Sequence, residues 1–415
     1  MRVAVIGGGV VGLACGWSLA QKGAEVVVIE RGLIGRGASE GNTGWVSPTI
    51  STPLASPGTL AMGLKSALDP DGALVIRPGL DTRWLRWLWA FRGAASRERF
   101  LRGVEALHNL NARTFEVLDA YADDGIPFEM HGGGILVLGK TEKGMAWFAP
   151  IFEDLQKLGF QGEIEHLDPA EAQAIEPAIN ASVPFIIRTT IDRFVRPESL
   201  MRGLADRLLA TGHEVRENVA VAGLQRRGDG WEIATDGDPI IADRVIVATG
   251  AQSPALLRPL GIDVPIVPAK GYSITLRGEG TRPTHALYLT EPKIGVSGFD
   301  GGVRIAGTFE LPGRDLTVDH ARIGRIVKET CTFLKDWHPA PEETMVEGWA
   351  GWRPATPDSL PLLGPVPGQP GLFLATGHGM LGVTLAPATG ALLADMIVDG
   401  VAPAWVNPMR PDRRF

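Results

Sequence analysis

The sequence contains little of the residue types that define several protein classes. Only two cysteines, Cys15 and Cys331, occur among 415 residues, which argues against a disulfide framework and favours a reducing cytoplasm. These cysteines and the eight histidines show no spacing such as Cys-x-x-Cys or His-Glu-x-x-His. Such spacings are typical of metal sites, so we expect no metal ligand set.

Charge and hydropathy argue against two further classes. The net charge is −7 and no basic stripe is present, so nucleic acid is not an expected partner. No uninterrupted apolar run reaches the roughly 18 residues that a membrane helix needs, so we predict no transmembrane segment. The chain begins with a short strand that leads directly into a glycine-rich turn, unlike a signal or transit peptide.

A nucleotide-binding pattern occupies the first thirty residues. Met1–Ile6 is a short run rich in β-branched residues, as expected of a buried parallel strand. The segment 7–12 fits G-x-G-x-x-G and is followed by a predicted helix. Glu25–Ile29 predicts a second strand, and Glu30 stands at its end. A glycine-rich motif between two strands, with an acid at this distance, indicates dinucleotide binding.

Each residue type in this pattern has a physical role. Gly7 permits the tight turn, Gly9 lets a pyrophosphate approach the backbone, and Gly12 lets helix and strand pack closely. The free N–H groups of the helix N-terminus bind phosphate. Glu30 accepts hydrogen bonds from the adenosine ribose, and its charge disfavours the 2′-phosphate of NADP. This motif alone does not separate FAD from NAD.

Three later segments favour FAD. Residues 31–44 form a loop of glycine and small polar residues, which either wraps a longer cofactor or is a plain surface loop. Arg244–Val247 predicts a strand that ends in Ala-Thr-Gly and returns to the nucleotide. Residues 371–384 predict a second strand and glycine-rich turn, followed by a helix. A flavin gains from this second turn, because a helix N-terminus near N1 and the C2 carbonyl stabilises the reduced ring.

Together these segments resemble the FAD-dependent D-amino acid dehydrogenases, within the wider D-amino acid oxidase-like superfamily. The resemblance covers nearly the whole chain and is most specific over residues 351–361, Gly-Trp-Arg-Pro-Ala-Thr-Pro-Asp-Ser-Leu-Pro. It implies an α/β FAD-binding domain with a Rossmann-like βαβ start, interleaved with an α+β substrate domain built on an antiparallel sheet. We expect the first domain at 1–80, 195–255 and 345–415, and the second at 81–194 and 256–344.

Motifs and resemblance together assign the cofactor site. The expected FAD-binding residues are Gly7, Gly9, Val10, Val11, Gly12, Glu30, Arg31, Ser39, Asn42, Thr43, Gly44, Val219, Ala248, Thr249, Gly250, Arg353, Gly377, His378, Gly379, Met380, Gly382 and Thr384. The related sarcosine oxidases attach flavin through a cysteine before the segment that matches residues 356–358. This chain has Trp352 and Arg353 there, so we expect non-covalent FAD.

Three residues are candidates for the chemistry. Arg353 offers a permanently charged, bidentate partner for a carboxylate, although an arginine in this position can also cap carbonyl groups. Tyr272, on a predicted strand, either holds a substrate oxygen or is a structural strand residue. His378 lies in the last glycine-rich turn, where it donates to the flavin or shapes the loop, and we do not expect a general base.

The predicted reaction is oxidation of a small amino acid, in the D configuration by resemblance, to an imino acid and then a keto acid. The expected electron acceptor is a quinone or O₂. A glycine/sarcosine-type or hydroxyproline-type amine oxidoreductase on the same scaffold, a non-catalytic flavoprotein, and an NAD dehydrogenase remain alternatives. Residues 84–91 carry three tryptophans between arginines and predict either a membrane-surface helix or a core-facing helix. The sequence predicts no oligomeric state.

Overall fold

The computed structural model describes all residues except 67–71, 78, 161, 277–281 and 338–347. Its start follows the predicted pattern. Strand β1 (Arg2–Ile6) and strand β2 (Glu25–Ile29) are parallel neighbours, and helix α1 (Val10–Gln21) connects them. The valines and isoleucines of both strands are buried, because helices or strands cover both faces of the sheet.

This βαβ unit belongs to a six-stranded sheet in the order β10-β2-β1-β14-β21-β20. Its other strands are β10 (Glu214–Arg216), β14 (Arg244–Val247), β20 (Leu362–Pro365) and β21 (Leu372–Thr376). All pairings are parallel except that of β20 with β21. Helix α12 (Gly382–Ala394) packs against α1 so closely that a Cβ on Gly390 would lie 2.4 Å from the carbonyl oxygen of Ala14.

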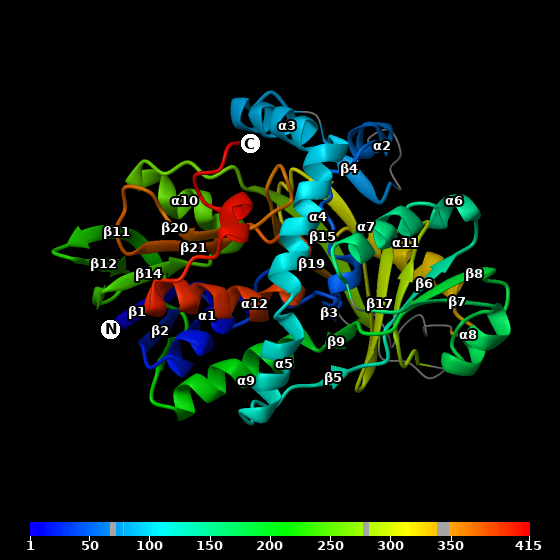
Figure 1. Cartoon of the computed structure of the whole chain (residues 1–415), viewed down its shortest axis with the longest axis horizontal. Helices are drawn as coiled ribbons and strands as arrows, with labels where there is room; N and C mark the ends of the chain where they lie inside the picture. The colour runs from blue at the N-terminus through cyan, green and yellow to red at the C-terminus, as the bar shows by residue number, and fades with distance from the viewer. Residues whose placement is uncertain (67–71, 78, 161, 277–281, 338–347) are drawn as a thin grey trace.

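The second large sheet has nine strands, eight of them in the order β19-β15-β18-β17-β16-β6-β8-β7, with β4 paired to β18. Their bounds are β4 (Leu74–Ile76), β6 (Ile135–Gly139), β7 (Ile164–Leu167), β8 (Phe185–Thr189), β15 (Val267–Leu276), β16 (Ala286–Leu289), β17 (Ile294–Phe299), β18 (Gly302–Leu311) and β19 (Trp349–Ala355). In Figure 1 this sheet lies to the right and the six-stranded sheet to the left.

Helices cover both faces of the nine-stranded sheet. Helices α8 (Pro169–Ile175) and α11 (His320–Cys331) pack on one face, in a core cluster that contains Ile323 and Ile326. Helices α4 (Arg97–Asn111) and α7 (Phe148–Lys157) pack on the other, against Val137 and Ile187. The two faces of the sheet are therefore distinguishable by which helix a side chain contacts.

The remaining elements are short or peripheral. A small antiparallel sheet consists of β11 (Val221–Arg227), β12 (Gly230–Thr235) and β13 (Ile240–Ala242), and another of β3 (Trp45–Val46), β5 (Met130–His131) and β9 (Arg193–Val195). The other helices are η1 (Pro48–Ile50), α2 (Thr59–Ser66), α3 (Thr82–Ala94), α5 (Thr114–Asp123), α6 (Glu142–Met145), α9 (Pro197–Ala210), η2 (Gly250–Gln252), α10 (Ser253–Leu257), η3 (Arg258–Leu260), η4 (Asp395–Asp399) and η5 (Ala404–Met409).

The expected fold class is confirmed, because a mixed α/β unit and a largely antiparallel sheet alternate along the chain. The sheets nevertheless cross the expected domain limits. Strands β4 and β19 fall in segments that we expected in the FAD-binding domain, yet both pair within the nine-stranded sheet. The expected boundary at residue 345 lies outside the described residues. The division into two domains therefore stays a prediction.

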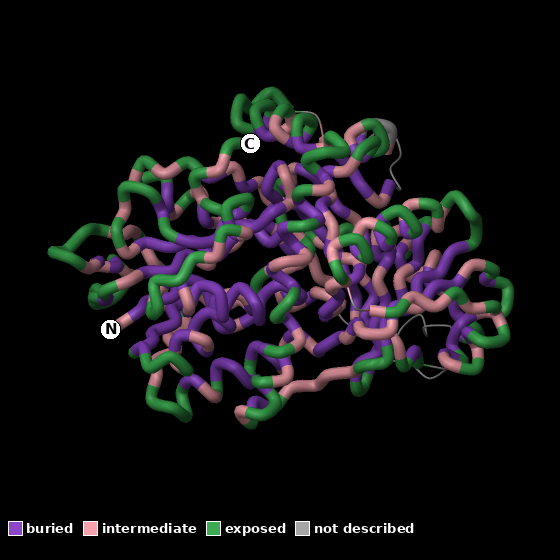
Figure 2. Tube along the Cα trace, in the orientation of Figure 1, coloured by how far each residue is buried: buried purple, intermediate pink, exposed green. Residues whose placement is uncertain are grey.

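One helical stretch differs from the expectation for membrane segments. By length and composition, Gly382–Asp399 is apolar enough to cross a membrane, with a mean hydropathy of 1.3. Of this window, 78% is buried inside the protein. A helix in the core of a protein passes the same test of length and composition. Figure 2 shows the region around α1 and α12 in purple, as buried.

Candidate active site

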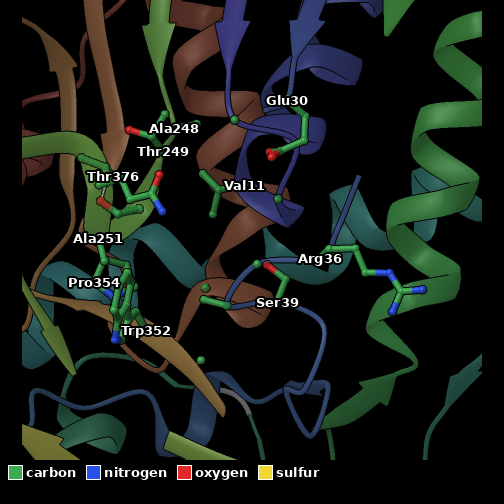
Figure 3. A pocket seen from close by; sticks show the side chains of 18 of the residues that line it. Val11, Glu30, Arg36, Ser39, Ala248, Thr249, Ala251, Trp352, Pro354 and Thr376 are labelled. Atoms are coloured by element: carbon green, nitrogen blue, oxygen red, sulfur yellow. Dashed lines mark hydrogen bonds between the residues drawn. The ribbon is translucent and has the colours of Figure 1, made fainter. Parts of the chain in front are cut away.

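A cavity of about 700 Å³ brings together most of the residues predicted from the glycine-rich turns. Figure 3 shows it between the ends of the strands, with Glu30, Ser39 and Thr249 around it. The predicted residues that line it are Gly7, Gly9, Val10, Val11, Glu30, Arg31, Ser39, Asn42, Val219, Ala248, Thr249, Gly250, Arg353, Gly377, His378, Gly379 and Gly382. Both large sheets therefore contribute to one cavity.

The turn between β1 and α1 has the geometry that a phosphate-binding loop needs. Gly7 has φ +114°, and a Cβ there would lie 2.6 Å from the carbonyl oxygen of Ala248, so only glycine fits. A Cβ on Gly9 would meet only Ser39 Oγ, at 3.5 Å, which leaves this backbone accessible from the cavity. The N-cap residue Gly9 has no side chain to cap α1, the first turn holds no acid, and only Ser39 Oγ accepts from the N–H of Val10, at 3.3 Å. The helix therefore presents N–H groups to the cavity, as a diphosphate requires.

Glu30 stands where a nucleotide ribose is expected. Its carboxylate accepts hydrogen bonds from the backbone N–H groups of Gly8, at 2.8 Å, and Gly32, at 3.0 Å. These contacts fix the side chain at the rim of the cavity, beside Val219. A carboxylate held in this way retains lone pairs for the two ribose hydroxyls. The residues present thus fit the adenosine half of FAD.

Six predicted residues do not line the cavity. They are Gly12, Thr43, Gly44, Tyr272, Met380 and Thr384. Gly12 serves packing, as expected of the third glycine, because a Cβ there would lie 1.9 Å from the carbonyl oxygen of Gly7. Gly44 has φ +78° and lies against the carbonyl oxygen of Val195. The hydroxyl of Thr384 donates to the carbonyl oxygen of Trp45, which makes it a structural link rather than a cavity residue.

Arg353 projects from β19 toward the neighbouring strands. A Cβ on Gly271 would lie 1.9 Å from its guanidinium, so the absence of a side chain at Gly271 creates the space for this arginine. Its Nη1 donates to the carbonyl oxygen of Thr308 at 2.9 Å, and its guanidinium carbon lies 5.5 Å from the ring centroid of Phe309. Burial lowers the pKa of Arg353 to about 10, which still leaves it charged at neutral pH.

Tyr272 lies on the opposite face of the sheet from Arg353 and does not line the cavity, which favours the structural alternative over contact with substrate. Successive strand residues point to opposite faces, and Gly271 faces Arg353. The buried Tyr272 packs in the cluster that contains α11, and its hydroxyl donates to Glu310 at 3.2 Å. Lys270, on the same face, donates to Asp315 at 2.9 Å. Both residues therefore stabilise the sheet.

His378 lies in the cavity wall and is buried, with its Nε2 3.1 Å from the hydroxyl of Thr389. Burial lowers the pKa of His378 to about 3, because the charged imidazolium loses its hydration. The side chain is consequently neutral at working pH. It is suited to hydrogen bonding and to shaping the turn.

Several cavity residues were missed by the sequence analysis as cofactor contacts. Among them are Arg36, Gln252, Trp349, Trp352 and Thr376. Trp352 Nε1 is buried without a hydrogen-bond partner, and Figure 3 shows its side chain beside Pro354. Trp349 and Trp352 both precede the predicted Arg353 on the same strand. Their position next to Arg353 in the sequence could have indicated that they contact the cofactor.

One group of residues has the composition of a metal site. Ligand atoms of Glu129, His131 and Asp300 lie within 4.8 Å of one another. Glu129 already pairs with Arg196 at 3.2 Å and accepts from the backbone N–H of Asp300 at 2.7 Å. The imidazole of His131 also stacks on Phe194. These contacts account for the group without an ion.

Comparison with known proteins identifies the class. A family model described as FAD dependent oxidoreductase, DAO, matches residues 2–396, and the chain belongs to this family. A D-amino acid dehydrogenase from Granulibacter bethesdensis is 33% identical over 405 residues, which cover 96% of each chain. The cofactor is FAD, and the chain is an FAD-dependent amine oxidoreductase.

Solved structures agree with the fold. Glycine oxidase from Geobacillus kaustophilus superposes with a TM-score of 0.78 at 23% identity, covering 100% of this chain and 99% of that chain. Iminodiacetate oxidase from a Chelativorans species superposes with a TM-score of 0.74 at 23% identity and covers 99% of both chains. At these identities the structural likeness establishes the fold alone.

Proposed function

We propose that this chain oxidises a small D-amino acid to its imino acid, with Arg353 binding the substrate carboxylate. The guanidinium of Arg353 carries the proposal, since it lines the cavity and pairs with no carboxylate among the described residues. An arginine that stays charged but is half desolvated gains strongly from a bidentate carboxylate. The D configuration is supported by the relative from Granulibacter bethesdensis.

The chain's own residues would orient the substrate rather than transfer its protons. Arg353 fixes the carboxylate, and the neutral His378 removes no proton from the amine at working pH. Bound flavin supplies the acceptor for the Cα hydrogen and its electron pair. The released imino acid reacts with water to give a keto acid and ammonia. Reoxidation then passes two electrons to a quinone or to O₂.

Titration of the purified protein under anaerobic conditions tests this function. We expect D-amino acids to bleach the flavin absorbance, and L-amino acids to have little effect. Arg353→Met should raise the substrate concentration for half-bleaching at least 100-fold, since it removes a charged hydrogen-bonded pair. Arg314→Met, at an exposed arginine, is the matched control. Bleaching by glycine or sarcosine alone would instead identify a glycine-type oxidase, and no bleaching by any amine would refute the function.

We further propose that the FAD is bound without a covalent bond. Cys15 and Cys331 are free, and neither lines the cavity. Acid precipitation should therefore leave all the yellow colour in the supernatant. Colour that stays with the precipitate would contradict the proposal.

We also propose that α3 contacts an anionic membrane surface on the cytoplasmic side, where a quinone would accept electrons. Trp84, Trp87 and Phe91 are buried, as a core-facing helix requires, but Trp89 is 74% exposed. Arg83, Arg86 and Arg92 are exposed beside it, and α3 contains no acid, although the whole chain carries −7. Figure 2 shows that the outer side of α3 lies at the surface. Exposed tryptophan beside arginine favours the interface of an anionic bilayer.

Co-sedimentation with vesicles tests this surface. The protein should pellet with vesicles that contain about 30% anionic phospholipid and remain in solution with neutral vesicles. Trp89→Ala and Arg86→Gln should each weaken binding, whereas Arg202→Gln, on the exposed face of α9, should not. Equal binding by all three variants would exclude α3 as the contact.

A further inference from the structure

Two hydrogen-bond donors without acceptors lie close together beside the nine-stranded sheet. The ammonium of Lys293 lies 5.2 Å from the ring centroid of Trp147 and 6.0 Å from that of Tyr288. Among the described residues no side chain or carbonyl group accepts a hydrogen bond from it. The indole Nε1 of Trp147 is buried and also lacks a partner. Two partnerless donors in one place favour a ligand that brings acceptors.

Aromatic rings surround this partly buried lysine. We call Trp45, Trp147, Tyr288 and Lys293 the Lys293 box. The rings of Trp45 and Tyr288 meet edge to face with centroids 5.8 Å apart, and those of Trp147 and Tyr288 at 6.1 Å. Burial lowers the pKa of Lys293, and the nearby charge of Glu291 raises it by a smaller amount. A carboxylate entering the box would favour the charged form of Lys293 and oppose this lowering of its pKa.

The Lys293 box faces the same side of the sheet as Arg353. Leu287 and Leu289 pack in the α11 cluster, so Tyr288 between them points to the other face. Tyr272 packs in that same cluster, whereas Arg353 lies over Gly271 on the other face. Tyr288 and Arg353 therefore project from one side of the sheet, the side on which the Ser39–Gly44 loop leads to Trp45.

Contacts at the start of β17 place the box near the backbone that Arg353 touches. Pro292 and Ile294, the two neighbours of Lys293 in the chain, line a small cavity together with Thr308 of β18. The carbonyl oxygen of Thr308 accepts the hydrogen bond from Arg353. Neighbouring strands lie about 4.8 Å apart. Lys293 thus directly precedes β17, the strand next to the one whose backbone accepts the hydrogen bond from Arg353.

We propose that Lys293 binds a second carboxylate of the substrate and makes the enzyme selective for acidic amino acids. This inference rests on the proposed function. Arg353 binds the α-carboxylate, and the side-chain carboxylate reaches Lys293 and the indole N–H of Trp147. Both ends of a dicarboxylic amino acid are then paired with a cation or a donor. An amide side chain would bring an N–H donor toward the ammonium and lose the charge interaction.

Steady-state kinetics on the FAD-loaded enzyme test the selectivity. D-Glutamate and D-aspartate should show a kcat/KM at least ten-fold higher than D-glutamine and D-asparagine. Lys293→Met keeps the length of the side chain and should lower this acid-to-amide ratio at least ten-fold. Trp147→Phe should lower it by a smaller factor, and Lys328→Met, at an exposed lysine of α11, should leave it unchanged. FAD content and melting temperature of each variant show whether it has folded.

Ligand binding gives a readout that needs no turnover. Glutarate should perturb the flavin spectrum at a concentration at least ten-fold lower in the wild type than in Lys293→Met, whereas for butyrate this ratio should stay below three-fold. If D-amino acids bleach the flavin but the acid-to-amide ratio is the same in wild type and Lys293→Met, the proposed function stands and this inference is overturned. If no amino acid bleaches the flavin, both are overturned.

Discussion

Burial shifts the pKa of three side chains toward the uncharged form, with different consequences at neutral pH. The pKa of Asp192 rises to about 7, that of His378 falls to about 3, and that of Arg353 falls to about 10. His378 is therefore neutral and Arg353 is charged throughout the range in which enzymes are assayed. Asp192 is the one of these three whose protonation changes within that range.

Asp192 should make the protein less stable as pH rises. Its carboxyl accepts hydrogen bonds from the hydroxyls of Thr49, at 3.0 Å, and Thr189, at 2.6 Å, but burial favours its neutral form more strongly. The folded state thus binds a proton that the unfolded state, with a pKa of about 3.9, has released. Between pH 4 and 7 the free energy of unfolding therefore falls by about 1.4 kcal/mol for each unit that the pH rises.

Denaturant unfolding of Asp192→Asn between pH 5 and pH 8 checks this effect. The variant lacks the titrating group, so its stability relative to the wild type should improve steadily as pH rises to 7 and then level off. Asp229→Asn, at an exposed aspartate, should show a constant difference. A constant difference for Asp192→Asn as well would mean that the wild-type carboxyl is already ionised at pH 5.

Glu30→Gln should weaken FAD binding at least ten-fold, the equivalent of about 1.4 kcal/mol. The amide has the same size but accepts weaker hydrogen bonds, and one end is a donor that faces the N–H of Gly8 or Gly32. Fluorescence titration of the apoprotein with FAD measures the change. Glu25→Gln, 63% exposed at the other end of the same strand, should bind FAD normally. An unchanged affinity for Glu30→Gln would remove Glu30 from the ribose site.

The sequence predicts residues whose role depends on local chain geometry and misses those that depend on tertiary position. Gly7, Gly9 and Glu30 were found because a turn and a strand end determine what they do. Tyr272 stayed open between substrate contact and a structural role, because strand alternation gives two faces and the sequence does not say which of them meets the cofactor. Lys293 belongs to no motif, and only the folded sheet brings it beside Trp147.

At the scale of single elements, the turn between β1 and α1 depends on the packing of Gly12. Gly12→Ala should abolish most FAD binding, since its Cβ would lie 1.9 Å from the carbonyl oxygen of Gly7 and would push the helix from the turn. Gly324→Ala is the control, because it lies inside α11 with nothing within 4 Å of the added Cβ. That change should stabilise the protein by up to about 1 kcal/mol. The FAD-to-protein ratio after gel filtration measures FAD binding by the two variants, and denaturant unfolding measures the stability of Gly324→Ala. Equal FAD-to-protein ratios would show that the turn tolerates the methyl group.

Helices and strands with a clear pattern were predicted closely, while sheet membership was not. The glycine-rich patterns located α1 and α12, because each pattern predicts a strand and a turn followed by a helix. Strand β19 overlaps the segment 351–361 that carries the family resemblance, yet its backbone pairs with β15 of the other sheet. Hydrogen-bonding partners of a strand lie far away in the sequence, so local composition carries little information about them.

At the scale of the whole molecule, one cavity joins the two large sheets. The glycine-rich turns after β1 and β14 border it on one side, and residues 349–354 of β19 border it on the other. A ligand that contacts both sides stabilises them together, because it binds only when both are folded. A ligand limited to the nucleotide end contacts the six-stranded sheet and leaves β19 unprotected.

Hydrogen–deuterium exchange of the apoprotein with FAD or with ADP separates these two cases. We expect FAD to slow exchange both in the peptide that contains Gly7–Gly12 and in the one that contains β19. ADP should protect the first peptide and leave the second as in the apoprotein, because it carries the ribose and diphosphate but no flavin. At 100 times its Kd each ligand adds about 2.7 kcal/mol to the state that it binds, enough for a clear difference in rate. Protection of β19 by ADP would mean that Trp349 and Arg353 contact the nucleotide end, and the proposed carboxylate site would then have to lie elsewhere.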